Sequence, residues 1–295
     1  MTSLAIFLSM RAIGAFFLST VLVAGVSIFI SSCNDVSIPV ASEVGTYDAT
    51  TSGKGATLLS GDNDIYPNVV PALIDDQVYG VDYQYGSRNP SSTILFAAIH
   101  GGNIEEGTTE IASNCAGGNS SSPQHDFYSF DGKKPANNNL YDNDSLHVTA
   151  THFNENSGIT RINNATKAIV LHGARNPTSS EKSAEGFGTN TKIIFVGGKD
   201  EALKSAVKAK LEEYFPQALV IIPTSQSSSY LKGYLGTSSS NFCNRTVSGK
   251  GVQLEMTWDF RKTLFTGGQL STPAQRASQT WEMVKLAVAL REAVE

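Results

Sequence analysis

Apolar and polar positions along the chain alternate between short runs that predict strands and longer repeats that predict helices. After residue 75 the apolar runs read, in chain order, QVYGVDYQYG, STILFAAIH, HDFYSFDG, SLHVTATHF, KAIVLHG, TKIIFVGG, ALVIIPT and GVQLEMTWDF. Most of these runs are apolar at successive positions, which is typical of strands that are covered on both faces. We therefore expect each run to form a strand of a sheet that is buried on both sides.

Two further segments predict helices. Residues 199–215 have Asp200 near the start, Pro216 just past the end and apolar residues every fourth position. Residues 272–295 place Pro273 in the first turn and carry an apolar stripe. Strands interleaved with helices predict an α/β domain of three layers, with a mixed central β-sheet flanked by helices.

The N-terminal residues do not fit that domain. An uncharged apolar stretch of 20 residues follows Arg11, and its length and flanks fit either an export signal or an uncleaved membrane anchor. Cys33, after ISS, resembles a lipoprotein cleavage site. We expect a signal peptide or N-terminal membrane anchor over 1–33, a flexible polar segment over 34–62 and a catalytic domain over 63–295. The protein would then be secreted or extracytoplasmic, touching a membrane only through its N-terminal segment or a lipidated Cys33.

Composition narrows the classes of function. The chain has 295 residues, 40% hydrophobic and 17% charged, so it can bury a substantial core as one large domain. A formal net charge of −5 without clustered Lys and Arg argues against a nucleic-acid partner. If Cys33 is lipidated or removed, Cys115 and Cys243 remain, and an oxidising compartment could join them in a disulfide. The alternative is two separate buried thiols.

Candidate chemistry lies where predicted strands end. His100 ends ILFAAIH, His172 ends KAIVLHG, and Glu255 lies within GVQLEM. Strand ends at one edge of an α/β sheet build the site, so these side chains can converge. Imidazoles with a carboxylate are a common ligand set of catalytic zinc. The alternatives are histidines that form structural hydrogen bonds and a Glu255 that faces outward.

The glycine-rich turn after His100 carries two carboxylates, Glu105 and Glu106. Two glycines beside the histidine let a substrate and a metal approach the backbone closely. Glu106 is expected to open the helix that follows, where the helix dipole favours a carboxylate. Glu105 remains as a candidate metal ligand together with His100.

Five motifs resemble those of one known family. They are AAIHGGNIEEGTTEIA, DFYSFDG, LHVTATHFNE, AIVLHGAR and NFCNRTVSGKGVQLEM, in this order between residues 79 and 261. Together they resemble the successive motifs of the poly-gamma-glutamate hydrolase family, which is related to zinc carboxypeptidases. The resemblance implies a zinc carboxypeptidase-like fold and one Zn²⁺ ion. It departs from the carboxypeptidase pattern itself, in which only two residues separate the first His and Glu.

The resemblance also implies roles for particular residues. His100, Glu105 and His172 correspond to the metal ligands, and Glu255 corresponds to the general base. Arg245 and Asn244, in the loop before Glu255, and Arg175, beside the His172 strand end, are the candidates for binding an anionic substrate. Tyr128, His147 and His152 lie in matched segments, where we expect structural hydrogen bonds. The segment MTWDFRK departs from the family pattern, so Arg261 receives no binding role.

The function implied is that of a secreted zinc-dependent hydrolase that cleaves γ-glutamyl amide bonds in poly-gamma-glutamate or a related peptide. Its partner would be an anionic γ-glutamyl polymer or peptide. One alternative is a zinc amidase or peptidase that acts on the stem peptides of peptidoglycan, which also contain γ-linked glutamate. The other is a catalytically inactive cell-surface binding protein with the same fold.

Overall fold

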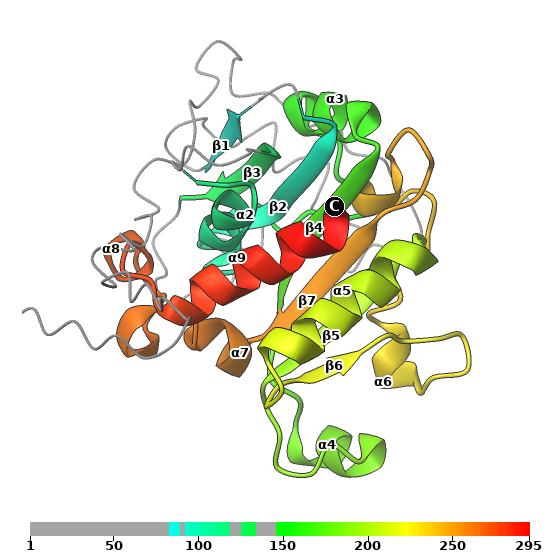
Figure 1. The fold of residues 1–295 in the computed structure, drawn as a ribbon, viewed down its shortest axis with the longest axis vertical. Helices are drawn as coiled ribbons and strands as arrows, with labels where there is room; N and C mark the ends of the chain where they lie inside the picture. The colour runs from blue at the N-terminus through cyan, green and yellow to red at the C-terminus, as the bar shows by residue number, and fades with distance from the viewer. Residues whose placement is uncertain (1–82, 89–91, 119–124, 134–145) are drawn as a thin grey trace, which may run out of the picture. The chain divides into compact units, whose positions relative to one another are not determined.

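A β-sheet with the strand order β1-β3-β2-β4-β7-β5-β6 forms the centre of the computed structural model, which describes residues 83–88, 92–118, 125–133 and 146–295 (Figure 1). The strands are β1 Tyr83–Arg88, β2 Ile94–Gly102, β3 Asp126–Gly132, β4 Lys167–Ala174, β5 Ile193–Gly198, β6 Leu219–Ile221 and β7 Val252–Thr257. Strands β3, β2, β4 and β7 run parallel to one another. β1 is antiparallel to β3, and the β5–β6 pair is antiparallel to β7. The predicted mixed sheet is confirmed.

Helices cover both faces of this sheet. The helices are α2 Thr108–Cys115, α3 Asn156–Asn164, α4 Ser179–Glu185, α5 Glu201–Tyr214, α6 Ser229–Lys232, α7 Trp258–Lys262, α8 Pro273–Arg276 and α9 Trp281–Val294, with 3₁₀ turns η2 Phe242–Asn244 and η3 Thr266–Gly268. α5 and α9 lie side by side across one face, which α2 also covers, and α3 packs near β2 and β3 (Figure 1). The predicted three-layer α/β fold is confirmed.

The buried faces of β2 show why its sequence is apolar at successive positions. Phe96 and Ala98 belong to the core beneath α2, α5 and α9, whereas Leu95 and Ala97 belong to a second core on the other face. All four side chains are fully buried. Alternate residues of a strand point to opposite faces, so a strand with two cores needs apolar residues at every position.

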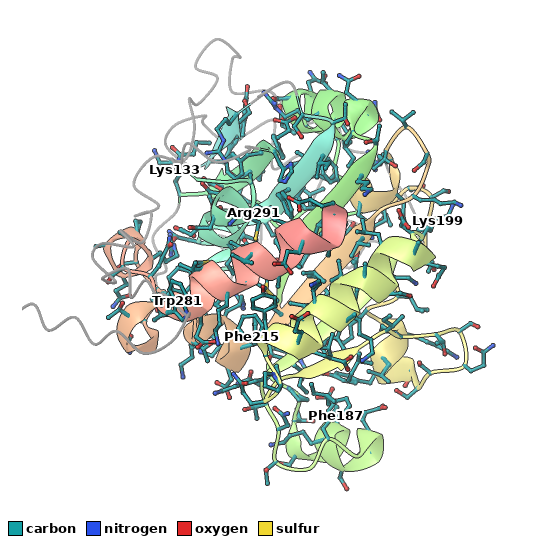
Figure 2. The ribbon with its side chains drawn as sticks, viewed as in Figure 1. Lys133, Phe187, Lys199, Phe215, Trp281 and Arg291 are labelled. Carbon is teal, nitrogen blue, oxygen red and sulfur yellow. The ribbon has the colours of Figure 1, made fainter. Side chains whose placement is uncertain are left out.

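The core beneath the helices is closed by aromatic contacts. Phe215, just after α5, lies with its ring centroid 5.2 Å from that of Phe260 in α7, and the ammonium of Lys285 in α9 is 5.1 Å from the Phe215 ring (Figure 2). One aromatic side chain therefore joins three helices that are far apart in the sequence. This packing fixes α7, which follows β7 directly, against the rest of the domain.

Some predicted elements differ from the observed ones. The run SLHVTATHF forms no strand in its described part, residues 146–153, where the amides of His152 and Phe153 both bond to the Thr149 carbonyl and close a turn. GVQLEMTWDF is a strand only to Thr257, after which α7 begins. QVYGVDYQYG contributes β1 from Tyr83, and its earlier residues lie outside the described part of the chain.

The predicted C-terminal helix is two helices, not one. α8 ends at Arg276 and α9 begins at Trp281. Between them Gln279 pairs with Phe265 as an isolated bridge, and the amide of Thr280 donates to the carbonyl of Leu264 at 3.0 Å. These backbone contacts to the preceding loop replace helical hydrogen bonds and so interrupt the helix.

The predicted disulfide between Cys115 and Cys243 is wrong. Both cysteines are buried and free. Cys115 lies in α2, in the core with Phe96, whereas Cys243 lies in η2, in the core with Leu95 on the opposite face of β2. The sheet therefore separates the two sulfur atoms, and a disulfide requires Cα atoms within about 7 Å.

The expectations for the N-terminal signal or anchor, for Cys33 and for the polar segment fall outside the described residues. None of the described helices has the length and apolar character that crossing a membrane requires.

We expect Cys115 and Cys243 to remain thiols in the folded protein. Peptide mapping after unfolding and alkylation without reductant should find both residues alkylated. Addition of reductant to the folded protein should leave its melting temperature unchanged. A mapped Cys115–Cys243 disulfide would contradict the placement of these residues on opposite faces of the sheet.

Asp131 makes the stability of the fold dependent on pH. It is buried, and its carboxylate accepts a 2.6 Å hydrogen bond from Thr109. Burial raises the pKa of Asp131 to about 6, so the folded state resists ionisation and loses stability as pH rises from about 4 to 6. Asp131→Asn should increase the free energy of unfolding by about 1–3 kcal/mol above pH 7 and by little near pH 4. Urea unfolding at several pH values measures this, and a pH-independent difference would contradict it.

Candidate metal centre

His100 and His172 reach the same face of the sheet because β2 contains one extra residue. The ladder with β3 advances from Ala98 to Gly101 along β2 while it advances only from Ser129 to Asp131 along β3. Without this bulge, His100 would point to the same face as Ala98, toward the helices. With it, the Nδ1 atoms of His100 and His172 lie 3.1 Å apart.

The turn after β2 folds Glu105 back onto His100. The amide of Glu105 donates to the carbonyl of His100 at 2.9 Å, and Thr108 donates its hydroxyl to the carbonyl of Glu105 at 2.9 Å. Gly102 has a φ of 63°, and a Cβ there would lie 2.3 Å from the carbonyl oxygen of Gly132. This turn therefore requires glycine, both for its backbone conformation and for the space beside β3.

Glu105 joins the two histidines into one cluster. Its Oε1 lies 2.9 Å from Nδ1 of His100, and its Oε2 lies 3.4 Å from Nδ1 of His172. The amide of Gly173 also donates to Oε2 at 2.7 Å. The three side chains that were predicted as metal ligands thus meet at the carboxyl ends of β2 and β4.

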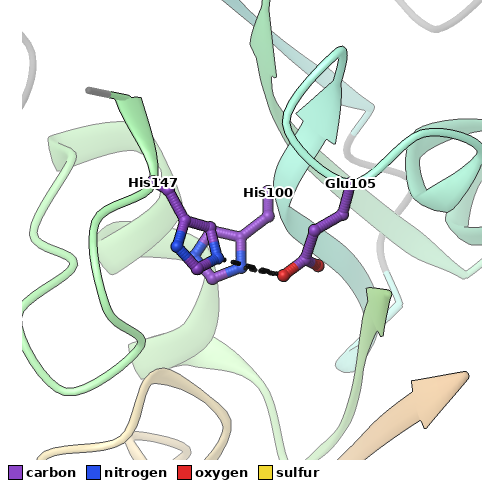
Figure 3. A group of neighbouring side chains, drawn as sticks. All are labelled: His100, Glu105 and His147. Carbon is purple, nitrogen blue, oxygen red and sulfur yellow. Dashed lines mark hydrogen bonds and ion pairs between the residues drawn. The ribbon is translucent and has the colours of Figure 1, made fainter. Parts of the chain in front are cut away.

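His147 is a further member of this cluster. It lies in the loop before α3, and its Nε2 is 3.1 Å from Oε1 of Glu105. The rings of His147 and His100 lie 4.0 Å apart, centroid to centroid, and both face Glu105 (Figure 3). His100, Glu105 and His147 also form a group able to hold a metal ion. From the sequence, only a structural hydrogen bond was expected of His147.

The donor atoms have the spacing that a zinc ion requires. In a tetrahedral site each donor lies about 2.0–2.2 Å from the ion, so neighbouring donors are about 3.3 Å apart. Nδ1 of His100 lies 3.1 Å from Nδ1 of His172 and 2.9 Å from Oε1 of Glu105, and Nδ1 of His172 lies 3.4 Å from the other carboxylate oxygen, Oε2. The residues therefore fit a divalent metal of this kind.

The hydrogen bonds of the imidazoles are consistent with this fit. Nε2 of His100 lies 2.8 Å from the carbonyl oxygen of Val148. If this nitrogen carries the proton and donates, the lone pair of Nδ1 faces the cluster, as in many metal-binding histidines. His172 differs in this respect, because its Nε2, the nitrogen that does not face His100 and Glu105, is buried without a hydrogen-bond partner among the described atoms.

Charge within the cluster also suits a metal ligand set. Burial, with the neighbouring His147, lowers the pKa of His100 to about 4, so its imidazole is neutral at neutral pH. Burial would raise the pKa of Glu105, but the adjacent imidazoles hold it well below its usual value. A neutral imidazole and an ionised carboxylate are the forms that bind metals.

Glu255 lies next to His172 because β4 and β7 pair in parallel with these residues opposite each other. Residues paired in this way point to the same face, and their strands are about 4.8 Å apart. Gln253 donates its side-chain amide to Oε1 of Glu255 at 3.3 Å. Burial, together with the charge of Glu105, raises the pKa of Glu255 to about 7, although the nearby His172 opposes this. Glu255 therefore faces the cluster rather than bulk solvent.

Asn244 and Arg245, predicted to bind substrate, are not brought to the cluster. The side chain of Asn244 accepts from the amides of Lys199 and Gly251 and donates to the carbonyls of Gly236 and Ser238. Gly251 precedes Glu255 by four residues of extended chain, about 13 Å. The four hydrogen bonds of Asn244 use the capacity of its amide, so its role in the structure is to hold loops together.

Arg245 has a similar structural role. Its guanidinium donates to the carbonyls of Thr151 and Phe153 at 2.9 and 2.7 Å and to the carbonyl of Ser240 at 2.6 Å. These bonds join the loop before β7 to the loop that carries His147. Arg245 thus acts on backbone groups, away from the strand ends that carry the cluster.

Arg175 directly follows β4 and stays close to the strand ends. Its side chain is 58% exposed and forms an ion pair with Glu181 at 2.5 Å. The guanidinium also lies 5.9 Å from the ring centroid of Tyr230. Of the three predicted substrate-binding residues, Arg175 is the one whose charged group is accessible, but a substrate carboxylate would compete with Glu181 for it.

A family model described as poly-gamma-glutamate hydrolase matches residues 69–287. The chain is 31% identical over 185 residues to the UPF0714 protein YndL of Bacillus subtilis (strain 168), covering 62% of this chain and 61% of YndL. It is 26% identical over 207 residues to the UPF0714 protein YmaC of the same organism, covering 70% of this chain and 74% of YmaC. The match to YndL thus spans less than two thirds of that relative.

The fold of this chain also superposes on two solved structures. A bacteriophage poly-gamma-glutamate hydrolase superposes with a TM-score of 0.61 at 28% identity, covering 76% of this chain and 93% of that protein. A zinc-free apo form of YndL superposes with a TM-score of 0.58 at 26% identity, covering 72% and 89%. The family model covers most of the chain, and the structures reproduce its fold. The chain belongs to the poly-gamma-glutamate hydrolase family.

Proposed function

We propose that this protein is a secreted, zinc-dependent hydrolase that cleaves γ-glutamyl amide bonds in poly-gamma-glutamate or a related peptide. The observation that carries the proposal is the meeting of His100, Glu105 and His172 within 3.4 Å of one another, with Glu255 on the adjacent strand. Membership of the family supports the hydrolase class. The zinc-free form of YndL supports zinc as the metal.

His100, Glu105 and His172 would hold one Zn²⁺ ion through two imidazole nitrogens and a carboxylate. An ion held there would supply Lewis-acid chemistry, the polarisation of a carbonyl and a lower pKa for water. His147 shares Oε1 of Glu105 and would orient that carboxylate from the more open side of the cluster. Its imidazole is also the fourth candidate donor for the ion.

Glu255 would act as the general base. Its carboxylate would accept the proton of the attacking water and then return it to the leaving amine as the C–N bond breaks. A pKa of about 7, raised mainly by burial, suits both steps because the group exchanges protons readily near neutral pH. Gln253, bonded to Oε1, would hold the carboxylate in one orientation. Arg175 would contribute to the binding of substrate carboxylates.

Secretion rests on the apolar stretch after Arg11, which lies outside the described residues. An extracytoplasmic protein would meet a polymer such as poly-gamma-glutamate, which is too large to cross a membrane.

We expect the zinc-loaded protein to shorten poly-gamma-glutamate and to release one amine for each bond cleaved. Size-exclusion chromatography of the polymer, with an assay for new amines, measures both. Cleavage of peptidoglycan stem peptides with an intact polymer would instead support the amidase alternative. Binding of the polymer without cleavage of either substrate would support an inactive binding protein.

Substitution of the proposed metal ligands should remove zinc, whereas substitution of the proposed general base should reduce only the reaction rate. His100→Ala and His172→Ala should each remove bound zinc, because two of three donors cannot hold the ion well. Glu255→Gln should retain zinc at one ion per chain but reduce kcat about 10²–10⁴-fold, the usual contribution of a general base. Metal analysis of the purified variants, with kinetics on the polymer, tests both results. Full activity in a metal-free wild type would refute the proposed mechanism.

A further inference from the structure

Arg261 is a buried cation that the roles assigned above do not use. It lies in α7 with 4% of its surface exposed. Among the described residues its guanidinium bonds to backbone carbonyl groups: Nη1 donates to Glu106 at 2.5 Å, Nε to Met256 at 3.2 Å and Nη2 to Ala174 at 3.5 Å. The Trp258 ring lies 5.3 Å away. Burial of a guanidinium is costly unless its donors are satisfied.

Each of these carbonyl groups belongs to a residue one or two positions after a member of the site. Glu106 directly follows Glu105, and Met256 directly follows Glu255. Ala174 is two residues after His172. The three segments come from the turn after β2, the end of β4 and the end of β7. One planar side chain thus links three separate parts of the chain, each of which supplies a group to the metal centre.

Gly173 lies between this side chain and the metal cluster. A Cβ atom at position 173 would lie 2.5 Å from Cζ of Arg261 and 2.6 Å from its Nη1. On its other side, the amide of Gly173 donates to Oε2 of Glu105 at 2.7 Å. The guanidinium therefore packs directly on the backbone that carries His172, and the absence of a side chain at Gly173 permits this contact.

We propose that Arg261 is a positioning residue of the metal centre, which sets the spacing of Glu105, His172 and Glu255 by holding the backbone beside each. It is not a ligand, yet the affinity for zinc depends on it. The inference rests on the proposed function, because it requires that this cluster binds the metal.

Arg261→Lys keeps the charge but replaces the planar fork with a single ammonium group, which cannot reach three carbonyl groups in the same way. Gly173→Ala keeps Arg261 but displaces it. Each variant should weaken zinc binding about 10–100-fold, as loss of partners around metal ligands commonly does. In the double variant the smaller lysine head leaves space for the methyl group, so its loss should be no greater than that of Arg261→Lys alone.

Arg88→Lys is the matched control. Arg88 also donates to backbone carbonyl groups, those of Ser113 and Gly118, but it joins β1 to the end of α2 rather than any segment that carries a cluster residue. This substitution should lower the melting temperature of the protein as Arg261→Lys does, yet leave zinc affinity within about threefold of the wild type. Circular dichroism would establish that each variant folds.

The measurement is the dissociation constant for Zn²⁺, obtained by competition with a chromogenic chelator on the full chain after removal of metal. The wild-type protein is measured first. If it does not bind zinc, the proposed function itself is overturned. If the wild type binds zinc and Arg261→Lys binds it equally well, only the role of Arg261 is refuted. Additive losses in the double variant would refute the contact between Arg261 and Gly173. A tenfold or greater loss with Arg261→Lys but not with Arg88→Lys would support the proposal.

Discussion

The candidate metal centre depends on a single extra residue in one strand. The bulge between Ala98 and Gly101 turns His100 away from the helices and toward His172. A regular strand of the same sequence would bury this imidazole among apolar side chains, where it would lack partners and destabilise the fold. The rest of the centre follows from the same feature, because the turn that carries Glu105 begins where β2 ends.

The imidazoles and the carboxylate of the cluster stabilise one another, which offsets the cost of burying each of them. A buried imidazole such as His100 favours its neutral form, and the carboxylate of Glu105 remains charged because imidazoles surround it. Removal of any one member takes a partner from the others in a region of low dielectric constant. Such arrangements are costly to folding, and proteins retain them at functional sites. The extensive apolar cores on both faces of the sheet supply the stability that such a cluster consumes.

Much of the fold was predictable because short apolar runs such as KAIVLHG and TKIIFVGG favour buried strands. The first ends at His172, and the second pairs with the strand of Glu255 through Phe195. What failed depends on contacts that leave no local pattern. The run containing His147 is apolar enough for a strand, but a turn at Thr149 decides its course. Asn244 and Arg245 precede Glu255 closely in sequence, yet an extended strand carries them to the far end of the sheet. Cys115 and Cys243 form an even pair in composition, but the sheet lies between them.

The pairing of His172 with Glu255 across neighbouring parallel strands has a consequence for ligand design. The hydrogen bonds of the sheet fix the backbone distance between the two residues at about 4.8 Å, so their spacing is set by the sheet and not by the loops. An inhibitor would need one group that binds a metal and a second, protonated group about 5 Å from it. Selectivity among related proteins would then have to come from the surrounding loops, since this spacing is common to any chain with the same strand register.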